Sequence, residues 1–320
     1  AIADGEQCVI GGIMEHIEEA GIHSGDSSCA LPAYSLSERE LDRIRSATHS
    51  LAMELNVVGL LNIQYASKGD ELYVLEVNPR ASRTVPFVSK AIGVPLAKLA
   101  ARVMAGKTLE EVGFTKEIEP PYVSIKCPVF PFERFTGVDT LLGPEMKSTG
   151  EVMGIDHDFG AAFAKAFIAA KHELPSRGSV FISVKPADKR AIIFPAKRLH
   201  DMGFKIYATP GTARMLSRVG VPVEIVYRLG DSRGANAIDL LADYKIQLVI
   251  NTPTGTGPQE DQAVIRREVI RYNVPCITTI AGAAAAVMGI EALRRAELSV
   301  VPLQEYHREI ETSLIDLDTP

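Results

Sequence analysis

The feature that most constrains the fold is a regular alternation in the last third of the chain. Strand-like runs over 179–184, 204–209, 223–226, 248–251 and 276–279 alternate with helical patterns near 189–201, 211–219, 235–243, 259–272 and 283–294. Short β-branched runs separated by helices indicate a parallel sheet with crossover helices. A Leu-Pro-Ser-Arg-Gly stretch at 174–178 is the best linker candidate. We therefore predict a doubly wound α/β domain with a five-stranded parallel sheet over residues 178–320.

Polar residues gather where these predicted strands end. A Thr-Pro-Gly-Thr turn at 209–212 lies between a strand and a helix, where free backbone N–H groups and hydroxyls form an anion cradle. Ligands of open parallel sheets bind at the carboxyl ends of the strands. The turn by itself is more simply a helix cap, but the convergence of cationic and amide side chains favours a bound phosphate. The predicted contacts are Lys189, Thr209, Thr212, Arg228 and Asn251.

Composition excludes several other classes of protein. The 320 residues are 46% hydrophobic and carry a formal net charge of −6, as expected of a soluble globular protein that binds neither nucleic acid nor an acidic membrane surface. No apolar run approaches the ~20 residues of a membrane span, and residues 1–7 lack the charged region of a signal peptide. The four cysteines are widely spaced, which predicts reduced thiols in the cytoplasm and neither a zinc site nor a disulfide framework.

The first half of the chain contains a predicted β-hairpin with polar residues on one face. Ser37 and Glu40 form a capping box that opens an amphipathic helix, and strand-like runs over 60–66 and 72–77 follow it around a turn-rich loop. If the hairpin turns at residue 70, paired residues have numbers that sum to 140. Gln64 then faces Glu76, and Asn62 faces Asn78, all on one face of the hairpin.

This face suits a hard cation. Oxygen ligands that include one carboxylate favour Mg²⁺ or Mn²⁺ bridging nucleotide phosphates over zinc. Glu76 interrupts an apolar strand, where a buried carboxylate would need a partner. Arg80 and Arg83 follow the strand end and offer guanidinium groups for phosphate or carboxylate oxygens. The alternative is an exposed polar hairpin face, and spacing alone leaves the two interpretations about equal.

The residues of this hairpin resemble the metal-binding end of an ATP-grasp domain. The resemblance lies in Gln64, Glu76, Asn78 and the run EVNPRASR at 76–83. Three further stretches, GGIMEHIE at 11–18, GIHSGDS at 21–27 and GPEMKSTGE at 143–151, are similar to the large subunit of carbamoyl-phosphate synthetases. The likeness covers nearly the whole chain. It implies the C-terminal part of an ATP-grasp domain over residues 1–177, followed by a methylglyoxal-synthase-like allosteric domain over 178–320, a mixture of α/β and α+β structure.

The resemblance also implies an activity and its parts. An ATP-dependent ligase of this family phosphorylates carbamate to carbamoyl phosphate for pyrimidine and arginine biosynthesis, and its partners are a glutaminase small subunit and the rest of the large subunit, in an oligomer. Upstream residues of the nucleotide clamp are absent from this sequence, so we expect the chain alone to be inactive as a synthetase. By carry-over, Arg80 and Arg83 are catalytic, and Gln64, Glu76 and Asn78 hold the metal. ATP contacts Gly21, Ile22, His23, Ser24, Gln64 and Glu76.

The same likeness makes the predicted phosphate site an effector site for a nucleotide of the UMP or IMP type. Two departures from the family pattern stand out. Pro253 replaces a hydroxyl ligand of some relatives, a role that Thr254 could take. Cys127 stands where ornithine-responsive relatives carry a carboxylate, although Glu18 and Asp26 remain, and this argues against ornithine activation. The alternatives are a stand-alone effector-binding module and, ranked low, a methylglyoxal synthase, which needs aspartates acting as base.

Overall fold

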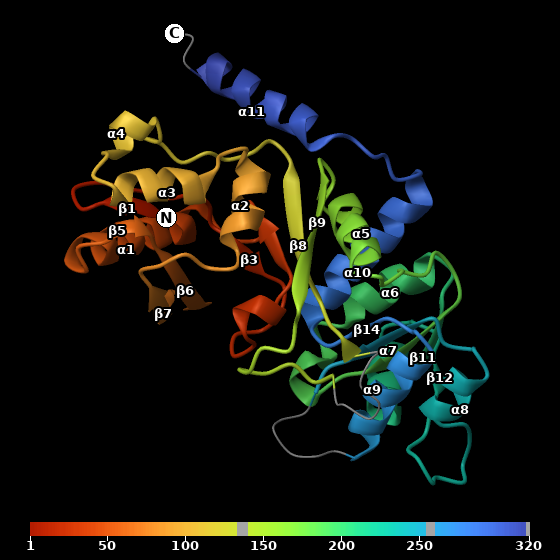
Figure 1. Ribbon diagram of the computed structural model, residues 1–320. Helices are drawn as coiled ribbons and strands as arrows, with labels where there is room; N and C mark the ends of the chain where they lie inside the picture. The colour runs from red at the N-terminus through yellow and green to blue at the C-terminus, as the bar shows by residue number, and fades with distance from the viewer. Residues whose placement is uncertain (133–139, 254–259, 318–320) are drawn as a thin grey trace. The chain divides into compact units, whose positions relative to one another are not determined.

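The computed structural model describes residues 1–132, 140–253 and 260–317, and the chain forms two compact units (Figure 1). The first contains residues 1–16, 29–126 and 299–320, and the second contains residues 17–28 and 127–298. Both units are therefore built from segments that are distant in the sequence. Within the described residues, no helix combines the length and the apolar character needed to cross a membrane.

Small antiparallel sheets organise the first unit. β1 (Ile2–Asp4) lies between β2 (Cys8–Val9) and β5 (Val58–Leu60), and β4 (Cys29–Leu31) pairs with both β3 (Glu15–His16) and β8 (Val123–Val129). The helices of this unit are α1 (Glu38–Glu54), α2 (Val85–Ile92), α3 (Leu96–Met104), α4 (Leu109–Val112) and α11 (Leu303–Leu317). The predicted capping box at Ser37 is confirmed, because its hydroxyl accepts the N–H of Glu40 while the Glu40 carboxylate accepts the N–H of Ser37.

The predicted hairpin is present in the first unit. β6 (Asn62–Lys68) pairs with β7 (Glu71–Asn78) in an antiparallel two-stranded sheet, and Gln64 lies opposite Glu76 while Asn62 lies opposite Asn78. The register predicted for these pairs is confirmed. Between Gln64 and Tyr65 a bulge shifts the pairing, so the predicted register is wrong nearer the turn, where Tyr65 pairs with Val74.

A five-stranded parallel sheet forms the centre of the second unit. Its order is β12 (Glu224–Ile225), β11 (Lys205–Ala208), β10 (Ser179–Ser183), β13 (Leu248–Asn251) and β14 (Cys276–Ile277). Phe181 and Val249 point to one face, where α8 (Ala237–Ala242) and α9 (Glu260–Arg271) pack against them. Their neighbours Ile182 and Ile250 are also fully buried, so both faces are covered and the predicted doubly wound topology is confirmed.

The remaining helices of the second unit are α5 (Phe159–Ala169), α6 (Ile193–Asp201), α7 (Pro210–Arg218) and α10 (Ile280–Arg295), with β9 (Gly150–Asp156) beside α5. α5 and α10 pack against each other through small side chains, as their Ala-rich sequences suggest. The helix predicted over 189–201 begins later than expected. A short 3-10 helix, η3 (Pro186–Lys189), precedes it, and α6 starts at Ile193.

Segment 17–28 folds with the second unit. The N–H of Ile17 donates to the carbonyl of Ser28 at 2.9 Å and closes the segment into a loop that contains the 3-10 helix η1 (Ser24–Asp26). The fully buried Asp26 carboxylate accepts the N–H groups of Lys147 and Ser148, both at 2.8 Å. The side of the loop that carries Asp26 is therefore fixed to its surroundings.

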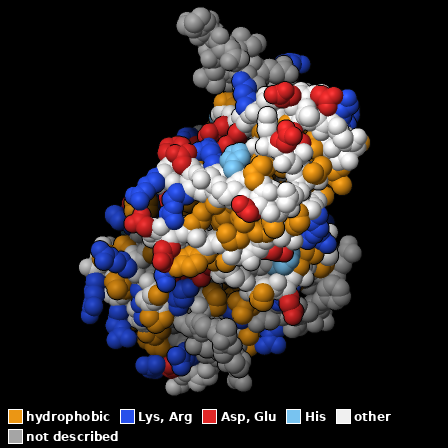
Figure 2. Space-filling model, turned by 90° about the vertical axis from the view of Figure 1, so that its left-hand side faces the viewer, with side chains coloured by type: hydrophobic (Ala, Val, Ile, Leu, Met, Phe, Trp, Pro, Cys, Tyr) orange, Lys and Arg blue, Asp and Glu red, His pale blue; other side chains and the backbone are white. Residues whose placement is uncertain are grey.

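Hydrophobic side chains also reach the surface, as Figure 2 shows for one side of the molecule. On β7, Tyr73, Val74 and Leu75 are each about half exposed (45%, 47% and 50%). Isolated exposed hydrophobic residues are common in folded proteins. Three in succession leave the middle of β7 exposed, whereas Val77 near the end of the strand packs against the hydrophobic cluster around Ala52 and Leu61.

Candidate functional site

The carboxyl ends of the central strands bring the predicted effector residues to one edge of the sheet. Ser183 at the end of β10 pairs with Asn251 at the end of β13, and Thr209 follows the end of β11 with its N–H donating to the carbonyl of Ile182 at 3.3 Å. Lys189 ends η3, which follows β10. Four of the five predicted contacts therefore come from segments that leave neighbouring strands at the same edge.

The N-terminus of α7 is the strongest anion site at this edge. α7 is nine residues long, and no side chain caps its first turn, so the N–H groups there are available to a ligand. A Cβ built on Gly211 would lie 3.0 Å from the Nζ of Lys189, which places the ammonium group directly over this turn. The Thr209 hydroxyl donates to the Thr212 hydroxyl at 3.3 Å. A cation, two hydroxyls and a helix N-terminus thus converge.

Asn251 is the most unusual residue of the edge. It is fully buried, and neither its Nδ2 nor its Oδ1 has a hydrogen-bond partner among the described residues. Buried amides are normally hydrogen-bonded, because an unpaired group loses its water without replacement. Arg228 lies beyond the carboxyl end of β12, near the same edge, and its side chain is exposed.

Sequence reasoning missed Ser183 and Lys185 at this edge. Thr252, which follows Asn251, donates its N–H to the carbonyl of Ser183 at 3.1 Å, and its Oγ1 accepts the N–H of Lys185 at 2.9 Å. A polar residue at the end of an apolar strand run was the available signal for Ser183. Thr254, considered above as a substitute hydroxyl ligand, lies outside the described residues.

The hairpin of the first unit carries the predicted metal ligands. Gln64 and Glu76 are directly paired across the strands, so their side chains extend on the same face. Glu76 is exposed, so the apolar residues beside it on β7 do not bury its carboxylate, and burial gives no support to the expectation that this carboxylate needs a partner. The donor set of two amide oxygens and one carboxylate still fits a hard divalent cation.

Arg80 lies beside this set. Its Nη2 donates to the Oδ1 of Asn78 at 3.3 Å, and its Nη1 donates to the carbonyl of Ala81 at 2.9 Å. Arg80 and Arg83 are both exposed. The guanidinium of Arg80 is therefore held just beyond the end of β7. There it can bind an anion on the hairpin face.

The predicted nucleotide loop, residues 21–24, lies in segment 17–28 of the second unit. The Nδ1 of His23 accepts the N–H of Gly25 at 3.0 Å, and the N–H of His23 donates to the carbonyl of Gly143 at 2.8 Å. Because Nδ1 is an acceptor, the neutral ring carries its proton on Nε2 and can donate to a ligand. The loop and the hairpin belong to different units.

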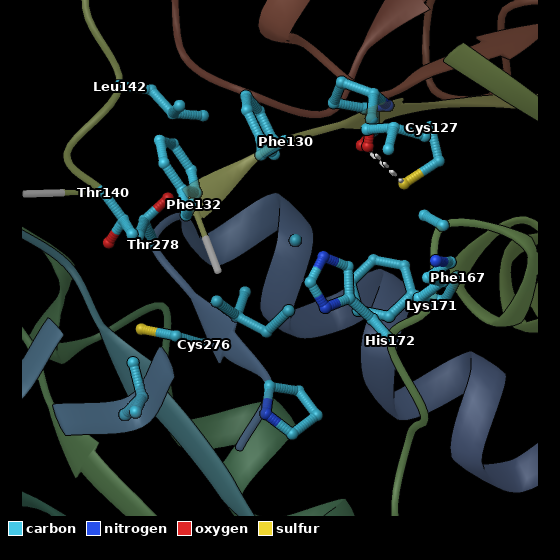
Figure 3. A pocket seen from close by; sticks show the side chains of 18 of the residues that line it. Cys127, Phe130, Phe132, Thr140, Leu142, Phe167, Lys171, His172, Cys276 and Thr278 are labelled. Atoms are coloured by element: carbon cyan, nitrogen blue, oxygen red, sulfur yellow. Dashed lines mark hydrogen bonds between the residues drawn. The ribbon is translucent and has the colours of Figure 1, made fainter. Parts of the chain in front are cut away.

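Cys127 lines a cavity of about 390 Å³ in the second unit (Figure 3). The Ser28 hydroxyl donates to its sulfur at 3.9 Å, and the carboxylate of Glu18 accepts the N–H of Ser28 at 2.5 Å. The carboxylate of Asp26 also accepts backbone N–H groups, and Asp26 is fully buried. These contacts support the prediction that the site is unsuited to a dibasic amino acid. The other walls are largely apolar and include Phe130, Phe132, Phe163 and Phe167.

Comparison with protein families gives each part of the chain a class. Residues 2–112 match the model of the "Carbamoyl-phosphate synthase L chain, ATP binding domain", and residues 191–278 match the "MGS-like domain". The first range contains the nucleotide loop and the hairpin, and the second contains Thr209, Thr212, Arg228 and Asn251. The chain thus joins part of an ATP-grasp ATP-binding domain to a methylglyoxal-synthase-like domain.

Curated relatives narrow the class further. The chain is 54% identical over 312 residues to the carbamoyl phosphate synthase large chain of Nostoc sp., covering 96% of this chain and 28% of that protein. It is 52% identical over 332 residues to that of Mycobacterium sp. strain JLS, with 97% and 30% covered. It is 51% identical over 320 residues to the large chain's C-terminal section in Methanocaldococcus jannaschii, with 97% and 52% covered.

The chain belongs to the carbamoyl phosphate synthase large chains, and it corresponds to their C-terminal section. It spans less than a third of the full-length relatives and about half of the archaeal C-terminal section.

Proposed function

We propose that residues 178–320 are an allosteric module that binds a phosphorylated effector of the nucleotide type at the edge formed by Lys189, Thr209, Thr212, Arg228 and Asn251. The observation that carries this proposal is the ammonium group of Lys189 over the uncapped first turn of α7. A phosphate there would accept backbone N–H groups and pair with the ammonium. The unpaired amide of Asn251 supplies a donor and an acceptor for the sugar or base of the same ligand.

Calorimetric titration of the chain with UMP, IMP and phosphoribosyl pyrophosphate tests this proposal. Lys189→Met removes one charge-assisted hydrogen bond worth about 1.5–3 kcal/mol, so affinity should fall roughly 10- to 100-fold. Lys197→Met is the matched control, because Lys197 pairs with Asp201 on the surface of α6 (3.6 Å). Absence of binding by all three ligands, or equal affinities of the two variants, would refute the effector site.

We propose further that the complete large chain is an ATP-dependent ligase that phosphorylates carbamate to carbamoyl phosphate for pyrimidine and arginine biosynthesis. In this proposal Gln64, Glu76 and Asn78 hold Mg²⁺ or Mn²⁺, which would neutralise phosphate charge when bound. Arg80 and Arg83 orient the phosphoryl and carbamate oxygens. Residues 21–24 contact the nucleotide, and the Nε2–H of His23 is a donor on that loop.

The ligase proposal includes partners: the remainder of the large chain, a glutaminase small subunit, and other copies in an oligomer, all in the cytoplasm. Glu76→Gln in the complete large chain tests the metal ligands, because it keeps the size of the side chain and removes its charge. We expect carbamoyl phosphate synthesis to fall at least about 100-fold, while effector affinity is unchanged. Full synthesis by this variant would contradict the assignment of Glu76. Glu71→Gln on the same strand is the control.

The loop after β12 offers the methylglyoxal synthase alternative no free aspartate as a base. Asp231, the aspartate in the loop after β12, accepts hydrogen bonds from the Arg233 guanidinium at 2.9 and 2.6 Å. These bonds lower the pKa of Asp231 to about 2. A carboxylate so engaged is a poor proton acceptor at neutral pH, which supports the low rank of this activity.

A further inference from the structure

Lys185 contacts the effector edge through its backbone. Its N–H donates to the Oγ1 of Thr252 at 2.9 Å, and Thr252 follows Asn251 on the chain. Lys185 also precedes η3, the single turn that ends in Lys189. A shift of either the end of β13 or η3 therefore changes the position of Lys185.

The side chain of Lys185 contacts segment 17–28. Its Nζ donates to both carboxylate oxygens of Glu19, at 3.0 and 3.1 Å, and lies 3.7 Å from the Oδ2 of Asp188. The Lys185 side chain is 25% exposed, and hydrogen bonding to Glu19 raises the pKa of its ammonium group above the ordinary value. Glu19 and Lys185 are 166 residues apart in the sequence. The pair lies within the second unit.

Glu19 is next to the nucleotide loop. The N–H of Ile22 donates to the carbonyl of Glu19 at 3.4 Å, so the loop turns directly on this residue. The far side of the segment is fixed by the buried Asp26, and its base is fixed by the Thr279 hydroxyl, which donates to the carbonyl of Ile17 at 3.4 Å. The Lys185–Glu19 ion pair is thus a contact of this segment with a residue that also touches the effector edge.

We propose that Lys185 is a positioning residue that couples the effector edge to the nucleotide loop through its ion pair with Glu19. This inference rests on the proposed effector function. A ligand that orders the ends of β10 and β13 restrains Lys185, Lys185 restrains Glu19, and the loop at 21–24 becomes less mobile. The coupling passes through groups in direct contact, the Lys185 N–H with Thr252 and the Lys185 ammonium group with Glu19.

The strength of the ion pair bounds the effect. A partly exposed ion pair contributes about 0–1 kcal/mol, which corresponds to at most about a fivefold change in an opening equilibrium. The coupling is therefore a modest adjustment of the loop and falls short of an on–off switch. The amide of His23 reports it, because its N–H is hydrogen-bonded to the carbonyl of Gly143 and exchanges only when the loop opens.

Hydrogen exchange of the full chain, with and without saturating IMP or UMP, tests this proposal in peptides that cover residues 17–28. We expect either bound nucleotide to slow exchange in this segment about two- to fivefold in the wild type. Lys185→Met and Glu19→Gln should remove the slowing, and Lys185→Arg should restore it. Glu19→Gln lies outside the effector edge, so its calorimetric affinity should equal that of the wild type. Lys197→Met is again the control.

The outcomes separate the two proposals. If neither nucleotide binds the wild type, the effector function itself fails. If a nucleotide binds and segment 17–28 is unaffected, or is slowed equally in Lys185→Met, the effector function stands and the coupling is wrong. Loss of slowing in Lys197→Met would also overturn the coupling, because that ion pair is remote from Glu19.

Discussion

Asn251→Leu should stabilise the chain and abolish effector binding at the same time. The fully buried Asn251 side chain leaves both of its polar atoms without a partner among the described residues. Each such atom costs about 1–3 kcal/mol, whereas an apolar side chain of similar shape carries no such cost. The branched leucine side chain must repack against its neighbours, and this offsets part of the stability gained by removing two unpaired polar atoms. We therefore expect a net increase in the free energy of unfolding of about 1–3 kcal/mol.

Scanning calorimetry measures this increase as a rise in Tm, at roughly 2–4 °C per kcal/mol for a chain of this order of size. Isothermal titration with IMP and UMP measures the accompanying loss of affinity. Asn236→Leu is the matched control. Asn236 caps α8 by accepting the N–H groups of Ile238 and Asp239, so its replacement should cost about 1 kcal/mol. If Asn251→Leu lowers the Tm as Asn236→Leu does, or still binds nucleotide, the reasoning that its amide is reserved for a ligand is refuted.

Three further predictions follow from contacts elsewhere. Asp26→Ala leaves two backbone N–H groups without an acceptor and should cost about 2–5 kcal/mol in thermal unfolding, whereas Asp42→Ala on the surface of α1 should change stability by less than about 0.5 kcal/mol. Burial, with a smaller contribution from the nearby Lys126, lowers the pKa of His16 from 6.5 to about 4. The unfolded chain therefore binds the additional proton between pH 6.5 and 4, and stability should fall by up to about 3 kcal/mol as pH decreases through that window. His16→Gln should flatten this dependence in unfolding experiments, and an unchanged slope would contradict it. Ornithine should produce no binding heat with the wild-type chain, because Cys127 supplies no charge to the cavity; saturable binding would show that the remaining carboxylates suffice.

The features of the fold that depend on local pattern were predictable from sequence. The β-branched runs after residue 178 gave the parallel sheet, because buried central strands require continuous apolar runs. The pairing of Gln64 with Glu76 followed from the position of the turn. The bulge after Gln64 did not, since a one-residue irregularity leaves no mark on the alternation.

Other features depend on contacts between distant segments, and sequence patterns do not encode them. The exposure of Glu76 could not be predicted, because it depends on what covers the middle of β7, and apolar neighbours in the sequence do not supply that information. The late start of α6 reflects Pro186, which begins a separate 3-10 turn and displaces the helix toward Ile193. The link between Lys185 and Glu19 joins residues 166 positions apart and has no local signal.

The phosphate position is the most direct test of the account. A crystal structure of the chain with bound IMP or UMP would locate it without reference to affinity. The account predicts phosphate oxygens within hydrogen-bond distance of the first-turn N–H groups of α7 and of the Lys189 ammonium group, with Asn251 contacting the same ligand. A nucleotide bound away from the carboxyl ends of β10, β11 and β13 would contradict it.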